Sequence, residues 1–224
     1  MQAEEIERIE EEEGEKETGR LEAFCDGVFA IAMTLLVFEL KTPLPADIHG
    51  SDTLLTALGH QWPELLAFAT SFASILIMWV NHHNLMLQIK RVDHTFLLLN
   101  GLLLFGATIV PFTTNLIAEH LESSGARIAA VIYSGGWVLV AISYNVLWRY
   151  ASHHGRLLAR DADLTFIRHI NAQYLVGPVL YLLAFLLAFV SAMVSFALIG
   201  LLAIFFAFPV SLTSRLTAFT RPRT

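Results

Sequence analysis

Residues 20–40 read RLEAFCDGVFAIAMTLLVFEL, and this stretch decides the fold class. It has no charge between Asp26 and Glu39, and it matches the ~20 helical residues that cross a ~30 Å hydrocarbon layer. The whole chain is also strongly apolar, since 55% of its 224 residues are hydrophobic, 15% are charged and the mean hydropathy is +0.60. A soluble chain of this length could not cover so much apolar surface with so little charge. We therefore expect an all-α polytopic membrane protein and not a disordered chain. A disulfide scaffold is excluded as well, because Cys25 is the single cysteine.

Five further segments are long and apolar enough to cross a membrane. Together with the first they predict six transmembrane helices, at 20–40, 63–88, 94–117, 127–149, 171–190 and 194–214. The last two share one apolar run from Phe166 to Phe208, which is too long for a single pass, so we expect a tight turn at Ser191–Ser195. The predicted organisation is a transmembrane domain at 20–216 between an acidic segment, 1–19, and a short C-terminal segment, 217–224.

The net charge of −6 is concentrated at the start of the chain. Residues 1–19 carry nine glutamates against Arg8 and Lys16, a net charge of −7, so the remainder is close to neutral. This distribution offers no basic face for a nucleic acid. Because its like charges repel one another, we expect the acidic segment to be disordered or a frayed polar helix.

The basic residues are distributed unevenly between the connections, and this asymmetry predicts the orientation in the membrane. Of the 14 lysines and arginines, only Lys41 and Arg127 fall on one side of the six-span arrangement. The others are Arg8, Lys16, Arg20, Lys90, Arg91, Arg149, Arg156, Arg160, Arg168, Arg215, Arg221 and Arg223. Basic residues are retained in the cytoplasm, so both termini are expected there.

Asp26 is the unusual residue of the first span, because it lies nearly two turns inside the apolar segment, where an unpaired carboxylate is costly. Arg20 is six residues back and on another face of the helix, so the main partner is expected from another helix. The candidates are His82, His83, Asn84 and Asn100. Two interpretations stay open: a structural polar cluster that joins helices, which we favour and to which Arg20 would contribute, and a proton relay.

A neutral stripe follows another face of the first span. Gly27, Ile31, Thr34 and Phe38 recur at helical spacing, with Leu35 beside them. For a single apolar helix, such a stripe is typical of packing or lipid contact.

The sequence from Arg20 to Asp26, followed by GVFAIAMTLL, resembles the R-x-x-x-F-S-D signature and first helix of the transmembrane protein 175 family. The segments SILIMWVNHHNLM and LLLNGLLLFGATIVPFTTNL resemble the second and third helices of these endolysosomal-type potassium channels, in their short prokaryotic form. The sequence departs from the signature at Cys25, where the family usually has serine. A thiol is a weaker hydrogen-bonding group than a hydroxyl, so this cluster could be weakened.

The resemblance implies a homotetramer in the lipid bilayer, here a bacterial plasma membrane, with a central potassium pore lined by the first helix and no TVGYG-type filter. Ile31 matches the apolar constriction and Thr34 the pore-facing threonine, while Leu35 and Phe38 continue the lining outward. A ring of apolar side chains gates by dewetting, and hydroxyl dipoles suit a partly dehydrated cation. Glu39 would attract cations at the outer end. The resemblance places Phe24, Cys25 and Asp26 in the structural polar cluster.

Two other functions fit part of the sequence less well. A proton-coupled secondary transporter would use Asp26 with His82 and His83, but the sequence shows neither an inverted repeat nor matched broken helices. An intramembrane enzyme is not expected, because HExxH, GxGD and GxSxG motifs are absent from the sequence. No bound metal or cofactor is expected either, since adjacent histidines point ~100° apart on a helix.

Overall fold

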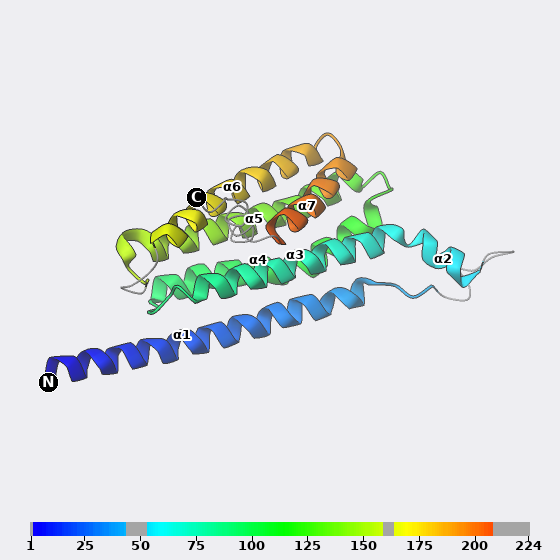
Figure 1. Cartoon of the computed structure of the whole chain (residues 1–224). Coiled ribbons are helices and arrows are strands. Elements are labelled where there is room, and N and C mark those ends of the chain that lie inside the picture. Colours follow the sequence, from blue (N-terminus) through cyan, green and yellow to red (C-terminus); the bar gives the residue numbers. More distant parts are fainter. Residues whose placement is uncertain (1, 44–52, 159–163, 208–224) are drawn as a thin grey trace, which may run out of the picture.

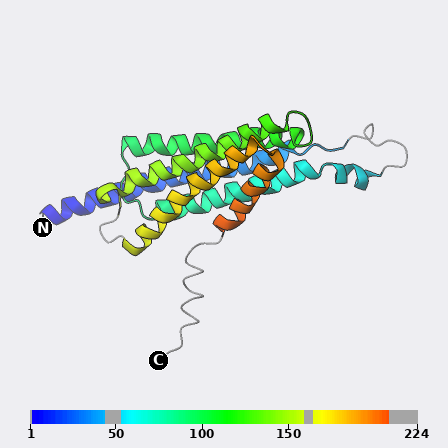
Figure 2. The ribbon, with the colours of Figure 1, turned by 90° about the horizontal axis from the view of Figure 1, so that it is seen from above.

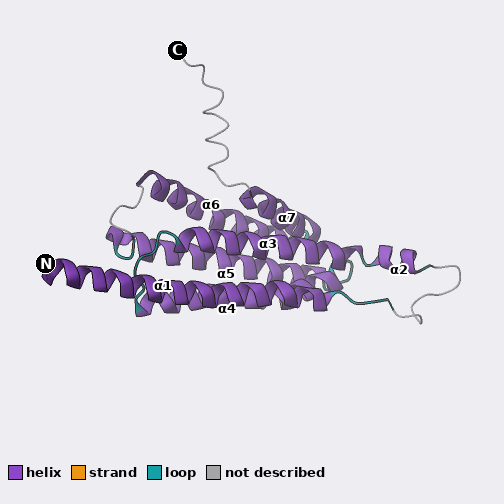
Figure 3. Cartoon of the chain, turned by 60° about the horizontal axis from the view of Figure 1, so that its bottom comes forward, coloured by secondary structure: helices purple, strands orange, loops and turns teal. Residues whose placement is uncertain are grey.

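The structure is a computed structural model that describes residues 2–43, 53–158 and 164–207. These residues form helices and their connections (Figure 3). The helices are α1 (Gln2–Leu35), α2 (Leu54–His60), α3 (Trp62–Met86), α4 (His94–His120), α5 (Ala126–Ser152), α6 (Leu164–Ala188) and α7 (Ala192–Ala207). Short 3₁₀ helices, η1 (Leu36–Glu39) and η3 (His153–Gly155), extend α1 and α5.

Four helices are long and apolar enough to cross a membrane, and they confirm the first four predicted spans. They are Gly14–Glu39, Trp62–Met86, His94–His120 and Ala126–Ser152. The apolar helices Tyr174–Ala188 and Ala192–Ala207 are shorter, and residues 208–214 of the sixth predicted span lie outside the described residues. The C-terminal segment 217–224 also lies outside them.

The turn between α6 and α7 is shorter than predicted. It occupies residues 189–191, and Ser195 is a buried residue inside α7. The cause is local, because Ser191 Oγ accepts a hydrogen bond from Val194 N at 3.4 Å and so caps the start of α7.

Residues 2–19 of the acidic segment belong to a helix that continues into the first span. Helix α1 begins at Gln2 and runs without a break past residue 19, so the predicted boundary falls inside a helix. Figures 1 and 2 show this end of α1 projecting beyond the other helices. Helix α1 contacts the bundle at Gly14, where a Cβ would lie 2.9 Å from the Lys90 carbonyl oxygen, and at Glu15, which pairs with Lys90 Nζ at 3.0 Å.

Helix α1 lies at the edge of the bundle (Figure 1). It packs against α3 and α4, whereas α5 packs against α4, α6 and α7. The buried face of α1 carries Cys25, Phe29 and Ala32, and Leu36 continues it at the start of η1. Each is no more than 1% exposed, and they are spaced by four, three and four residues. This spacing is that of one helical stripe. The opposite face, which carries Phe24, Ile31 and Leu35, is exposed and is not covered by the other described residues.

One end of the bundle, here called the basic end, contains the α3–α4 connection and the residues after α5. There Lys90 N donates to Leu157 O at 2.9 Å, and Ile89 pairs with Leu158. Gly155 has a φ of +67°, a left-handed conformation that glycine adopts without strain. The two connections are therefore joined by backbone contacts.

Candidate functional site

Two separate sets of polar contacts join α1 to α3 and α4 around Cys25 and Asp26. In the first, His82 Nε2 lies 2.9 Å from Asn100 Oδ1, and Asn100 Nδ2 donates to Cys25 Sγ at 3.1 Å. All three side chains are buried, and the ring of Phe29 packs 5.4 Å from that of His82. This set joins three helices through side chains that the sequence had singled out.

Asp26 belongs to the second set, and its partner was not among the predicted candidates. Trp79 Nε1 donates to Asp26 Oδ1 at 2.8 Å. His83 Nδ1 lies 2.7 Å from Glu22 Oε1, and its ring stacks with that of Trp79 at 6.1 Å. An indole N–H is a donor only and therefore suits a carboxylate. Trp79 precedes His83 by four residues, so helical spacing could have revealed it.

The other residues of the predicted cluster lie outside these two sets. Within the described residues, neither Arg20 nor Asn84 is bonded to Asp26. Arg20 is exposed and lines an open groove with Phe24, Asp93 and His94. The six-residue spacing places Arg20 and Asp26 roughly 120° apart around the helix, so the two side chains point in different directions. Within the described residues Asp26 is bonded to Trp79 and not to Arg20, and a role of Arg20 in the cluster stays a prediction.

The predicted pore residues share the uncovered face of α1. Ile31 is 60% exposed and Phe38 79% exposed, and Thr34 and Leu35 are also exposed. Thr34 Oγ1 donates to Ile31 O at 2.9 Å, which occupies its proton and leaves its oxygen able to accept. The stripe is apolar apart from this hydroxyl.

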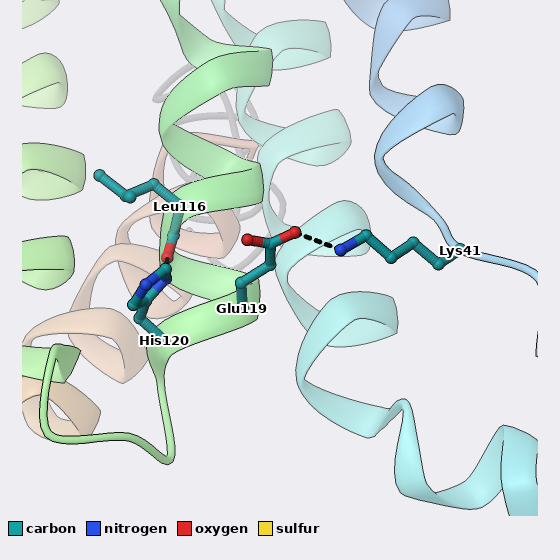
Figure 4. A network of polar contacts seen from close by, with 4 residues as sticks. All are labelled: Lys41, Leu116, Glu119 and His120. Atoms are coloured by element: carbon teal, nitrogen blue, oxygen red, sulfur yellow. Dashed lines mark hydrogen bonds and ion pairs between the residues drawn. The ribbon is translucent and has the colours of Figure 1, made fainter. Parts of the chain in front are cut away.

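The opposite end of the bundle holds an ion pair between Lys41 and Glu119 (Figure 4). His120 Nδ1 lies 3.1 Å from Leu116 O in the same region. The hydrogen bond to Glu119 raises the pKa of Lys41, which lies two residues after the end of η1. Glu39 is half-buried nearby. No local pattern in the sequence predicts this pair, because its members are 78 residues apart.

At the basic end, Asp93 joins α4 to α5. Its Oδ1 accepts from Phe96 N at 2.8 Å, and its Oδ2 accepts from Tyr150 Oη at 2.6 Å and lies 3.3 Å from Arg156. Burial raises the pKa of Asp93, but these hydrogen bonds and the Arg156 charge outweigh it and hold the pKa below its ordinary value. In the part of the chain that the structure describes, three or more His, Cys, Asp or Glu residues nowhere gather in a metal-binding arrangement.

A potassium channel of Chamaesiphon minutus is 50% identical to this chain over 193 residues, which cover 86% of the chain and 95% of that protein. The chain belongs to the TMEM175 family. The model for this family, described as endosomal/lysosomal potassium channel TMEM175, matches residues 20–111 and so begins at Arg20.

Other TMEM175 relatives are similar to this chain over the same share of its length. A potassium channel of Streptomyces collinus is 42% identical over 193 residues, covering 86% of this chain and 92% of that protein. The crystal structure of a lysosomal potassium-selective channel TMEM175 homologue from Chamaesiphon minutus matches with a TM-score of 0.76 at 46% identity, covering 86% of this chain and 97% of that one. These relatives confirm the family resemblance seen in the sequence. They also confirm the predictions that the chain is an integral multi-pass membrane protein and that it is not an enzyme.

Proposed function

We propose that this TMEM175 chain is a subunit of a potassium-selective channel, a homotetramer in which four copies of α1 surround a central pore. The observation that carries this proposal is the uncovered face of α1 and its extension η1. Ile31 and Thr34 on α1 and Phe38 on η1 are exposed there, while the other face of α1 packs on α3 and α4. Relatives described as potassium channels support the choice of ion.

Ile31 forms the constriction in this proposal. Four isoleucine side chains at one level leave a narrow apolar ring that excludes water until it widens. Leu35 and Phe38 continue the apolar lining toward the end that carries Lys41. Such a ring acts as a gate without any charged residue.

Thr34 supplies the polar contact for the ion. Its hydroxyl proton is directed to the Ile31 carbonyl, so the hydroxyl oxygen can present lone pairs to a cation. Potassium loses its hydration water more easily than sodium, so a ring of neutral oxygen dipoles favours it. Glu39, at the end of η1, raises the local cation concentration at the outer mouth.

The membrane arrangement completes the proposal. Helices α6 and α7 supply the fifth and sixth spans, both termini are cytoplasmic, and the protein resides in a bacterial plasma membrane. The basic end of the bundle then faces the cytoplasm, and the acidic start of α1 projects from it.

The bi-ionic reversal potential of the purified protein in liposomes tests the proposal. With potassium on one side and sodium on the other, the reversal potential should approach the potassium equilibrium value. A reversal potential near zero would exclude selectivity, and uphill potassium movement driven by a proton gradient would show a coupled carrier.

The coupled carrier finds less support in the geometry. Its relay would run from Asp26 to His82 and His83, but Asp26 is bonded to Trp79. His82 is bonded to Asn100 instead, and His83 to Glu22.

A further inference from the structure

The basic end of α5 carries an open pocket outside the proposed pore. It is lined by Val146, Arg149, Tyr150, His153 and Arg156 and has a volume of about 350 Å³. This is roughly ten times the ~30 Å³ that one water molecule occupies in the liquid. Two guanidinium groups, an imidazole and a phenol thus surround one space.

The two arginines differ in what they already bind. Arg156 lies 3.3 Å from Asp93 Oδ2 and 4.9 Å above the Tyr150 ring, so it is held in place and partly neutralised. The side chain of Arg149 is exposed and makes no hydrogen bond or ion pair with another described residue. Among the described residues, Arg149 is therefore the cation of this pocket whose charge is not already paired, and it can meet an anion.

An apolar stripe leads along α5 to this pocket. Ile128, Ile132, Ile142 and Val146 are between 40% and 68% exposed. At 100° per residue they lie on the same face of the helix as Arg149 and His153. In a membrane-spanning helix, an exposed stripe of this kind contacts acyl chains, and a basic residue at its end meets the headgroup layer.

We propose that this pocket binds the phosphate of an anionic phospholipid, with the acyl chains against the α5 stripe. The charge is complementary, because a guanidinium donates two hydrogen bonds to a phosphate. Basic pockets beside transmembrane helices are suited to such headgroups. Val146 supplies the apolar contact directly next to the headgroup.

The test uses the full chain in a mild detergent, with added phosphatidylglycerol or phosphatidylcholine. Bound lipid is measured by native mass spectrometry and stability by thermal unfolding. Phosphatidylglycerol should bind more tightly and raise the unfolding temperature more, and its advantage should shrink as salt increases. Arg149→Gln should weaken phosphatidylglycerol binding about fivefold, while Arg149→Lys should retain part of it.

Arg127→Gln is the matched control, because it removes one exposed charge from the opposite end of the same helix. The proposal is overturned if both glutamine variants lose phosphatidylglycerol equally or if the two lipids bind equally well. Inorganic phosphate or glycerol 3-phosphate that stabilises the protein as well as the lipid would show a free-anion site and also overturn it. A change in oligomer mass in Arg149→Gln, with lipid binding unchanged, would also overturn the proposal. It would show that a second copy of the chain, and not a lipid, occupies the α5 stripe.

Discussion

Trp79 Nε1 donates a hydrogen bond to Asp26 Oδ1 at 2.8 Å and so joins α3 to the one carboxylate that lies deep in the first apolar span. Four residues later, His83 contacts Glu22 at 2.7 Å. The two contacts connect consecutive turns of α1 and α3. Together they hold the helix that is proposed to line the pore.

Trp79→Phe removes the indole donor and keeps most of the ring. We expect the free energy of unfolding to fall by about 1.5–3 kcal/mol, the usual contribution of a hydrogen bond to a charged group. Thermal unfolding in detergent measures this, with Trp62→Phe as the control because Trp62 is exposed at the start of the same helix. Asp26→Asn should also destabilise the protein. A fully stable Asp26→Asn protein that has lost only transport would favour a proton relay.

Cys25→Ser restores the residue that the family signature usually has. Because Asn100 Nδ2 already donates to Cys25 Sγ at 3.1 Å, a hydroxyl there should accept the same bond more strongly. We expect the free energy of unfolding to rise by about 0.5–1 kcal/mol. Cys25→Ala should lower it, since the Asn100 amide loses an acceptor. Equal losses in both variants would contradict this role for the thiol.

Asp93 should make the stability of the folded protein depend on pH. Its pKa in the folded protein lies below the ordinary value, so its stabilising contribution is complete above about pH 4 and is lost as the pH falls through the folded pKa. Asp93→Asn should lower the unfolding temperature at pH 7, and this difference should narrow in acid. Tyr150→Phe removes one donor and should give a smaller effect of the same sign. A difference that stays constant between pH 7 and pH 3 would contradict the prediction.

Ile31→Asn places polar groups at the proposed constriction. It should lower the barrier to wetting and raise the basal current, with weaker discrimination against sodium. Single-channel or flux recordings in liposomes measure both quantities. An unchanged current with full selectivity would argue that Ile31 does not form the gate.

Thr34→Ala keeps the dimensions of the pore close to those of the original but removes the hydroxyl dipoles. We expect potassium preference to fall more than open probability changes. Bi-ionic reversal potentials report the first quantity and single-channel recordings the second. A change confined to open probability would assign Thr34 to gating.

The sequence predicted the elements that depend on local hydropathy. The first four spans are correct to within a few residues except at the start of α1, where the helix continues into the acidic segment. Helix formation across the highly charged residues was left open, because charge repulsion and helix propensity oppose each other there.

Pairing between helices was predicted only in part. His82, Asn100 and Cys25 were singled out and do meet, because polar groups in an apolar span need partners. The partner of Asp26 was missed, since Trp79 is counted as apolar and its donor is not visible in hydropathy. The Lys41–Glu119 pair depends on how the chain folds back, which no local pattern encodes.

Ile31→Cys in a Cys25→Ser background tests most directly whether α1 lines the pore. An aqueous thiosulfonate should react with the cysteine and block potassium current through the liposome-reconstituted protein. Ile128→Cys in the same background is the control, because Ile128 is similarly exposed but lies on α5. Block at position 31 and none at position 128 is the expected result. A cysteine at position 31 that reacts only with lipid-soluble reagents, with the current unchanged by aqueous ones, would place Ile31 outside the pore.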